Sequence, residues 1–270
     1  MKRLIILFVL LLSSINTYSQ EANPLSKVSC YVEIYHDNKK LGNATGFFFN
    51  TATKTYFITN NHVVGGEFFK NEYVRLHNHA LPIDSTPNKI TVRIYRYEIN
   101  NTFNITLPID QSCIKFYNDA AKNNLMDVVA IPINDAIKIQ LNNTVTLSSQ
   151  NISADLLLAP SSELFIVGFP YDFAKFGVYP IWKRGTIASE PNLRNVNNSQ
   201  FWIDATTRAG MSGSPVFFRG SSYATAMSPN TLSGQINTFL VGIYSAQNYQ
   251  IEIGIVWDLH NVIEELNKLN

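Results

Sequence analysis

Apolar residues come in many short runs along this chain, and clusters of Gly, Pro, Asn, Asp and Ser separate one run from the next. The run 29–35 alternates and is followed by a polar Asp-Asn-Lys-Lys turn, and the return run begins at 46–49, which is typical of a β-hairpin. Similar runs recur throughout and predict strands rather than helices. The segments that we predict as strands are 29–35, 46–49, 56–59, 73–76, 90–95, 125–133, 163–167, 178–182, 186–188, 201–205, 215–218, 239–245 and 251–257.

Helical periodicity is clear only in the C-terminal segment 258–270, where Asp258 is the expected N-cap. Two polar segments lack periodicity: 134–151, which we expect to link two halves of the chain, and 221–237, which we expect to be a loop. Many short strands and one terminal helix predict an all-β fold of the barrel type. The apolar residues at helical spacing in the last segment are Leu259, Val262, Ile263 and Leu266.

The N-terminal segment 1–19 has the three parts of a secretory signal peptide. A short basic start precedes the apolar run 4–12, and a polar stretch with small residues leads to Gln20, before which we expect cleavage. The apolar run is far shorter than the roughly 20 residues that span a bilayer, and no later run approaches that length. We therefore expect a soluble mature chain, 20–270, in the periplasm or secreted, without membrane insertion.

Charge and composition exclude several classes of function. Loss of Lys2 and Arg3 with the signal peptide changes the formal charge from +1 to −1 (1 − 2), which argues against a nucleic-acid or membrane-surface binder. His77 and His79 lie close together, but no Cys or acid cluster nearby completes a metal site. The sequence therefore predicts no metal and no cofactor.

The most informative local pattern is a glycine-punctuated turn, Gly210-Met211-Ser212-Gly213, between two apolar runs. Glycines on both sides of Ser212 permit positive φ and close approach of a ligand. Such a turn can expose a serine hydroxyl while its backbone N–H groups point into the same space, as acyl transfer requires. Gly, Ser and Pro also fill ordinary hairpins, so the pattern needs a histidine and an acid elsewhere in the chain.

Two upstream residues meet that need. His62 follows a predicted buried strand and precedes a Gly-Gly break, so that the scaffold fixes it while its ring is free to face a cleft. Asp127 leads directly into the apolar run 128–131, where a carboxylate needs a hydrogen-bonding partner because burial is costly. An imidazole N–H is such a partner; local backbone N–H groups are the alternative.

The order His62, Asp127, Ser212 and the segments around these residues resemble the trypsin/chymotrypsin-like serine peptidase family. Within this family, the residues of these segments are most similar to the short bacterial branch, which includes the periplasmic heat-shock proteases and the glutamyl endopeptidases. The resemblance implies two six-stranded antiparallel barrels with the site between them, here 20–141 and 142–270. The matching segments are 46–49 (GFFF), 58–64 (ITNNHVV), 127–131 (DVVAI), 168–170 (GFP), 210–215 (GMSGSP) and 241–243 (VGI).

The resemblance also implies roles for these residues. Ser212 is the nucleophile, His62 the base and then the acid, and Asp127 the group that holds the imidazole tautomer. The backbone N–H groups of Gly210 and Ser212 form the oxyanion hole. Met211 departs from the family, because many relatives carry Asp or Asn before the serine, so activation by a freed N-terminus pairing with that acid is not available here.

Alignment with the family places Thr206 at the base of the primary substrate pocket and Ile243, Tyr244 and Ser245 along its wall. None of these residues is acidic, so cleavage after Lys or Arg is not expected. Arg208 lies close enough to the expected pocket to favour cleavage after acidic residues. The simpler interpretation is that it is a loop arginine exposed to solvent.

Three alternatives stay open at this point. Cys30 and Cys113 either form one disulfide, as an exported protein permits, or are two buried thiols. The chain is either a serine endopeptidase acting on protein or peptide substrates, or a catalytically latent protein of the same fold that acts as a binding or scaffold protein. An α/β-hydrolase is disfavoured, because there the serine precedes the acid and the histidine.

Overall fold

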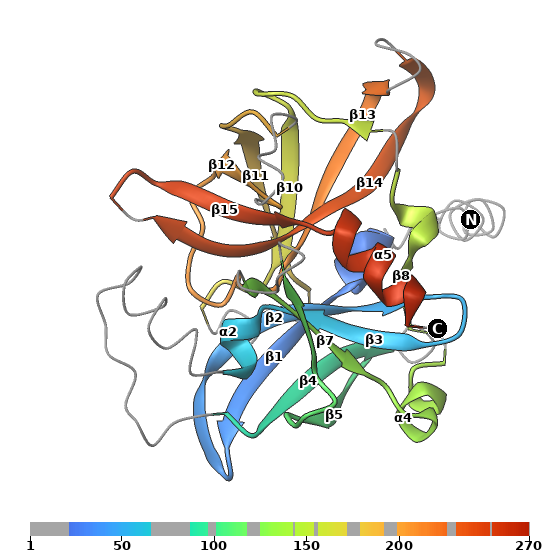
Figure 1. Ribbon diagram of the computed structural model, residues 1–270, viewed down its shortest axis with the longest axis vertical. Helices are drawn as coiled ribbons and strands as arrows, with labels where there is room; N and C mark the ends of the chain where they lie inside the picture. The colour runs from blue at the N-terminus through green and yellow to red at the C-terminus, as the bar shows by residue number, and fades with distance from the viewer. Residues whose placement is uncertain are drawn as a thin grey trace, which may run out of the picture.

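The computed structural model describes residues 22–65, 87–96, 101–117, 125–142, 144–153, 156–171, 179–191, 199–225, 231–248 and 250–269. The segment 1–19, the strand expected at 73–76 and the histidine pair at 77 and 79 lie outside the described residues. The chain folds into two β-sheet halves, one above the other in Figure 1, which confirms the all-β, two-barrel prediction.

The first half is an antiparallel sheet in the order β5-β4-β1-β2-β3-β7-β6, and β8 pairs with β2 in parallel at its side. Its inward positions are filled by alternate residues, so that Phe48 of β2 and Val129 of β7 face the interior of this half. The short strand β8 comes from the segment 134–151 that we expected to be linking chain. The strands of the first half are β1 (Ser29–His36), β2 (Lys39–Asn50), β3 (Thr55–Thr59), β4 (Lys89–Arg96), β5 (Asn101–Pro108), β6 (Ile114–Tyr117), β7 (Leu125–Pro132) and β8 (Leu147–Ser148).

The second half is a barrel in the order β10-β11-β12-β15-β14-β13, closed by the pairing of β10 with β13. The segment 221–237 is not wholly the loop that we expected: β13 extends to Thr225, β14 begins at Thr231, and Tyr223 pairs with Thr231. The hydrophobic pattern missed this pairing because 221–237 is mostly polar, with isolated apolar residues. The strands are β9 (Leu156–Leu157), β10 (Glu163–Gly168), β11 (Ile181–Ile187), β12 (Gln200–Asp204), β13 (Pro215–Thr225), β14 (Thr231–Asn248) and β15 (Ile253–Asp258).

Short helices also occur outside the predicted C-terminal helix. Asp258 is the last residue of β15 rather than the N-cap, which is Leu259, but its Oδ1 accepts a hydrogen bond from the His260 N–H at 2.8 Å. The prediction was therefore wrong by one position, since the strand continues to the helix without a connecting loop. The helices are η1 (Pro24–Lys27), α2 (Asn61–Val64), α4 (Asp135–Gln140), η2 (Ser149–Asn151) and α5 (His260–Lys268).

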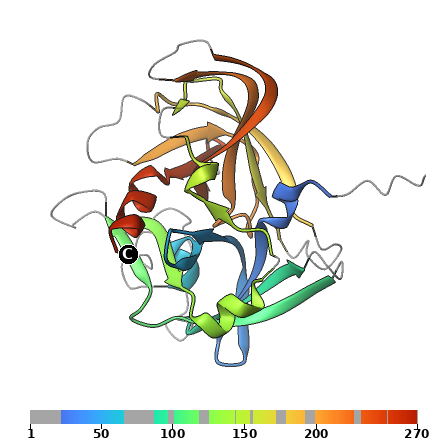
Figure 2. The ribbon, with the colours of Figure 1, turned by 90° about the vertical axis from the view of Figure 1, so that its right-hand side faces the viewer.

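A shared apolar core joins the two halves. Phe47 and Val128 from the first half pack with Ile243 and Trp257 from the second, and α5 adds Leu266, which is fully buried. Figure 2 shows α5 (red) beside the strands of the first half, although it follows the second half in sequence.

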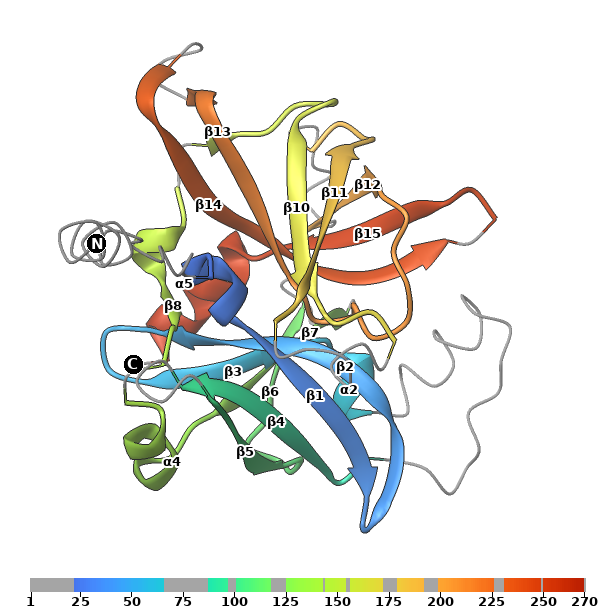
Figure 3. The ribbon, with the colours of Figure 1, turned by 180° about the vertical axis from the view of Figure 1, so that it is seen from behind.

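On the other side of the junction β1 meets β10 (Figure 3), and the Ser29 hydroxyl donates to the Val167 carbonyl at 2.6 Å. These contacts also hold the two halves against each other.

Candidate active site at the junction of the two barrels

His62 and Asp127 are in direct contact. His62 lies on the single-turn helix α2, which follows β3 and ends at Gly65 with φ +78°, and Asp127 lies near the start of β7. The His62 Nδ1 is 2.7 Å from Asp127 Oδ2, and the His62 backbone N–H donates to Oδ1 at 2.9 Å. The Asn60 amide donates to the Asp127 carbonyl at 2.7 Å and ties the start of α2 to β7. Asp127 is therefore paired with the imidazole, not only with local backbone groups.

Ser245, the last residue of the apolar run on β14, connects this pair to Ser212. Its hydroxyl donates to Asp127 Oδ2, and its carbonyl accepts a hydrogen bond from the Ser212 hydroxyl at 2.9 Å. The resemblance places Ser245 in the wall of the substrate pocket. The sequence signal for its hydrogen bond to Asp127 is a serine at the end of an apolar strand, because a buried hydroxyl needs a hydrogen-bond partner. The structure thus brings Ser212, Ser245, Asp127 and His62 together at the junction of the barrels.

The turn around Ser212 has the backbone shape that its glycines predict. Gly210 has φ +93° and Gly213 has φ +87°, conformations that side chains with a Cβ rarely adopt. Among the described residues, no hydrogen-bond acceptor pairs with the N–H groups of Gly210 and Ser212, whereas the N–H groups of Met211 and Gly213 are bonded to Arg208 and Tyr244 carbonyls. Two backbone donors of the turn are therefore left for another acceptor.

Met211 is fully buried and packs in the interior of the second barrel. The position where many relatives carry an acid is thus an apolar core position in this chain. Hydrogen bonds from other residues hold the turn.

The residues expected at a substrate pocket differ in exposure: some are exposed in the structure and others are buried. Thr206 is exposed, while its neighbour Thr207 is buried and its hydroxyl bonds to the Tyr244 hydroxyl and to Gln247 Oε1, the latter at 3.1 Å. Ile243 is fully buried in the core shared by the two halves, so it does not line a pocket wall. Exposure alternates along the chain after β12, so that Thr206 faces outward and Thr207 faces inward. The role of Thr206 at the base of the pocket stays a prediction.

The two cysteines are free thiols: Cys30 is buried on β1 and Cys113 is half-buried before β6. Burial raises the pKa of Cys30 to about 12, so this thiol is not a nucleophile near neutral pH. The described part of the chain contains no cluster of three metal-ligating side chains, and no helix within it is long and apolar enough to span a bilayer.

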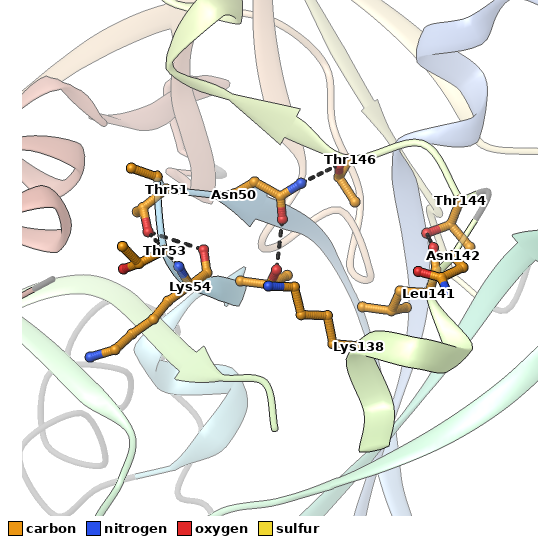
Figure 4. Close-up of a pocket in the computed structure, with 11 residues that line it drawn as sticks. Asn50, Thr51, Thr53, Lys54, Lys138, Leu141, Asn142, Thr144 and Thr146 are labelled. Atoms are coloured by element: carbon orange, nitrogen blue, oxygen red, sulfur yellow. Dashed lines mark hydrogen bonds between the residues drawn. The ribbon is translucent and has the colours of Figure 1, made fainter. Parts of the chain in front are cut away.

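A cavity of about 330 Å³ lies away from these groups, between the β2–β3 turn and α4 (Figure 4). Its lining is hydroxyl- and amide-rich, with Lys54 and Lys138 as the charged members, and His62, Asp127 and Ser212 do not line it. It is separate from the candidate active site.

The fold and the groups at its junction define the class of the protein as a trypsin-like serine peptidase. The chain belongs to this family: the model of the trypsin-like peptidase domain matches residues 44–221. Solved structures agree on the fold. A serine endoprotease from Yersinia pestis aligns with a TM-score of 0.51 and 13% identity, over 92% of this chain and 67% of that one. A Glu endopeptidase in complex with MPD aligns with a TM-score of 0.51 and 15% identity, over 93% and 94% of the two chains. No curated protein matches the chain.

Proposed function

We propose that this protein is an exported serine endopeptidase that hydrolyses peptide bonds through an acyl-enzyme intermediate. The observation that carries the proposal is the contact of His62 with Asp127, joined through Ser245 to the hydroxyl of Ser212. Family membership supports a hydrolase acting on proteins or peptides. The signal-like segment 1–19 supports export to the periplasm or beyond.

In this proposal Asp127 sets the protonation of the imidazole. Its carboxylate accepts from the Nδ1–H of His62, so that Nε2 carries the lone pair and can take a proton. The Ser212 oxygen attacks the carbonyl carbon of the substrate while its proton passes to Nε2. The tetrahedral intermediate then breaks its C–N bond, and the imidazolium returns the proton to the leaving amine. Water hydrolyses the resulting serine ester with His62 again as the base.

The backbone donors of Gly210 and Ser212 are proposed to stabilise the oxyanion of that intermediate. Both N–H groups lack a partner among the described residues, as a hole ready for a substrate oxygen requires. The Ser212 hydroxyl donates to Ser245 in the absence of substrate, so attack begins with a rotation about its single side-chain torsion toward His62.

The buried hydroxyl and amide groups of Thr207, Tyr244 and Gln247 lie beside the serine turn and are uncharged. They support the expectation that cleavage after Lys or Arg is not preferred. A peptide library with all residues at the cleavage position tests this expectation, and dominant cleavage after basic residues would contradict it.

The first experiment is labelling with a fluorophosphonate probe, which modifies only an activated serine. We expect labelling of the wild type and none of Ser212→Ala or His62→Ala. Ser29→Ala is the matched control, because it also removes a hydroxyl that donates to a backbone carbonyl, in this case that of Val167 on β10 rather than one of the site residues. A folded wild-type protein that is not labelled and does not cleave casein would favour the binding or scaffold alternative instead.

A further inference from the structure

The carbonyl groups of the serine turn are all held by hydrogen bonds. The Ala209 carbonyl accepts from the Tyr171 N–H at 2.5 Å, and the Gly210 carbonyl accepts from the Thr45 hydroxyl at 2.8 Å. The Met211 carbonyl accepts from both the N–H and the hydroxyl of Ser214, and the Ser212 carbonyl accepts from the Thr45 N–H at 2.8 Å. Four consecutive peptide groups of the turn are therefore fixed.

Fixing a carbonyl also fixes the next N–H, because a trans peptide group is planar and its C=O and N–H point in opposite directions. The bond from Tyr171 to the Ala209 carbonyl thus aims the Gly210 N–H, and the bonds from Ser214 to the Met211 carbonyl aim the Ser212 N–H. These are the two N–H groups without a partner among the described residues.

Two of these five hydrogen bonds come from the first barrel, and both come from one residue on β2. Thr45 on β2 is fully buried and contributes both its hydroxyl and its N–H to the turn, and its hydroxyl also accepts from the Phe169 N–H at 3.0 Å. Asn43, two residues earlier on the same face of β2, donates from its side-chain amide to the Tyr171 carbonyl. Thr45 and Asn43 therefore hold both the turn and the 168–171 segment packed against it.

Three further observations indicate that this support is required. Tyr171 has φ +50°, an uncommon conformation for a residue with a Cβ, which persists where the surrounding contacts demand it. A Cβ on Gly210 would lie 2.4 Å from the Phe169 carbonyl and 2.5 Å from the Asn43 amide, so the turn and its support are in tight contact. The Met211 side chain adds no polar contact that could hold the turn, because it is buried among apolar side chains.

We propose that Thr45 and Asn43 are positioning residues for the oxyanion donors. Through them, the first barrel orders the serine turn of the second barrel. The inference rests on the proposed peptidase function and adds a requirement to it: the Gly210 N–H is aimed correctly only while the β2 side chains hold the turn and Tyr171.

The test compares Thr45→Val, which keeps the shape of the side chain and loses its hydroxyl, with Thr45→Ser, which keeps the hydroxyl. Removing one oxyanion donor costs about 10²–10³ in rate, and misdirecting one is expected to cost about 10- to 100-fold. We expect this loss in the maximal rate of fluorophosphonate labelling and in kcat for a peptide selected from the cleavage library. The concentration for half-maximal labelling and KM should change less than about threefold, because ground-state binding is not affected. Thr45→Ser should recover most of the rate.

Thr55→Val is the matched control, because it removes a buried hydroxyl that donates to Asn50 Oδ1, away from the turn. It should lose stability like Thr45→Val but keep the wild-type labelling rate. Asn43→Asp provides a second test if Thr45→Val does not fold: it replaces the donor to the Tyr171 carbonyl with an acceptor at a half-buried position. Its control is Asn104→Asp, the same change at an exposed position on β5.

Slow labelling of Thr45→Val and Asn43→Asp, with normal labelling of both controls, is the expected result. A folded Thr45→Val or Asn43→Asp variant with the wild-type maximal rate would overturn the inference and leave the peptidase proposal intact. If the wild-type protein is not labelled, both the peptidase proposal and this inference are wrong. The wild type alone gives that result, so it can be told apart from a failure of the inference.

Discussion

Replacing Asp127 with asparagine changes one carboxylate oxygen into an amide nitrogen and keeps the shape of the side chain. In the wild type this carboxylate accepts three hydrogen bonds: from the His62 N–H, from the His62 ring and from the Ser245 hydroxyl. Asparagine has one oxygen, so it cannot accept all three. If that oxygen keeps the bond to the His62 backbone, the amide nitrogen faces the ring.

An amide nitrogen facing Nδ1 donates to it, and the imidazole proton then moves to Nε2. This tautomer cannot accept the proton of Ser212 at Nε2. By analogy with the same change in a serine protease triad, we expect kcat to fall by about 10⁴, which corresponds to about 5.4 kcal/mol of transition-state stabilisation. KM should change little, because Asp127 is buried and does not face the substrate.

The assay is hydrolysis of a library-selected fluorogenic peptide under saturating and limiting substrate, with thermal unfolding measured on the same samples. Asp258→Asn is the matched control: it neutralises another buried carboxylate and retains the oxygen that accepts from the His260 N–H. If folded Asp127→Asn keeps more than about a tenth of the wild-type kcat, the tautomer argument for this site is wrong.

Three other changes test the packing and the buried groups. Gly213→Ala would place a Cβ 1.9 Å from the Thr45 carbonyl oxygen, at a residue with φ +87°. We expect it to lower the free energy of unfolding in urea by more than about 3 kcal/mol. Gly42→Ala is the control and should be nearly neutral, because the space around its Cβ is open. Leu266→Ala on α5, at a fully buried position, should cost about 2–5 kcal/mol in the same measurement. Cys30 keeps its proton in the folded state up to a pKa of about 12, while the unfolded thiol loses it near pH 8.5, so stability should fall as pH rises above about 8.5. Relative to Cys30→Ala, the wild type should lose about 2 kcal/mol between pH 8 and pH 10, and equal pH profiles of the two proteins would contradict this assignment.

Local patterns were sufficient for much of the fold. Short β-rich runs bounded by turn residues placed most of the strands, because a strand that buries a face shows its period in the sequence. The same reasoning failed for 221–237, where β13 and β14 pair through their backbones although the sequence there is mostly polar. It also missed α2 and α4, which are too short to show a helical period.

Some features of the candidate site could likewise be predicted from the sequence, and others could not. The turn around Ser212 has local chemistry that the sequence shows directly, since two glycines are needed for its backbone shape. The pairing of His62 with Asp127 could be expected from a histidine after a strand and an acid before one. The contacts of Ser245 with Asp127 and Ser212 could not, because they span 118 and 33 residues of sequence and depend on how β14 lies against β7.

The sequence by itself determined the all-β class and indicated the serine turn, His62 and Asp127 as the candidate site. Tertiary structure alone decided that Thr207 rather than Thr206 faces inward, that Met211 belongs to the core, and that Thr45 holds the turn from the other barrel. The physical reason is that a local motif fixes backbone shape and residue type, whereas the partner of a buried polar group is set by the register and packing of strands that are distant in sequence.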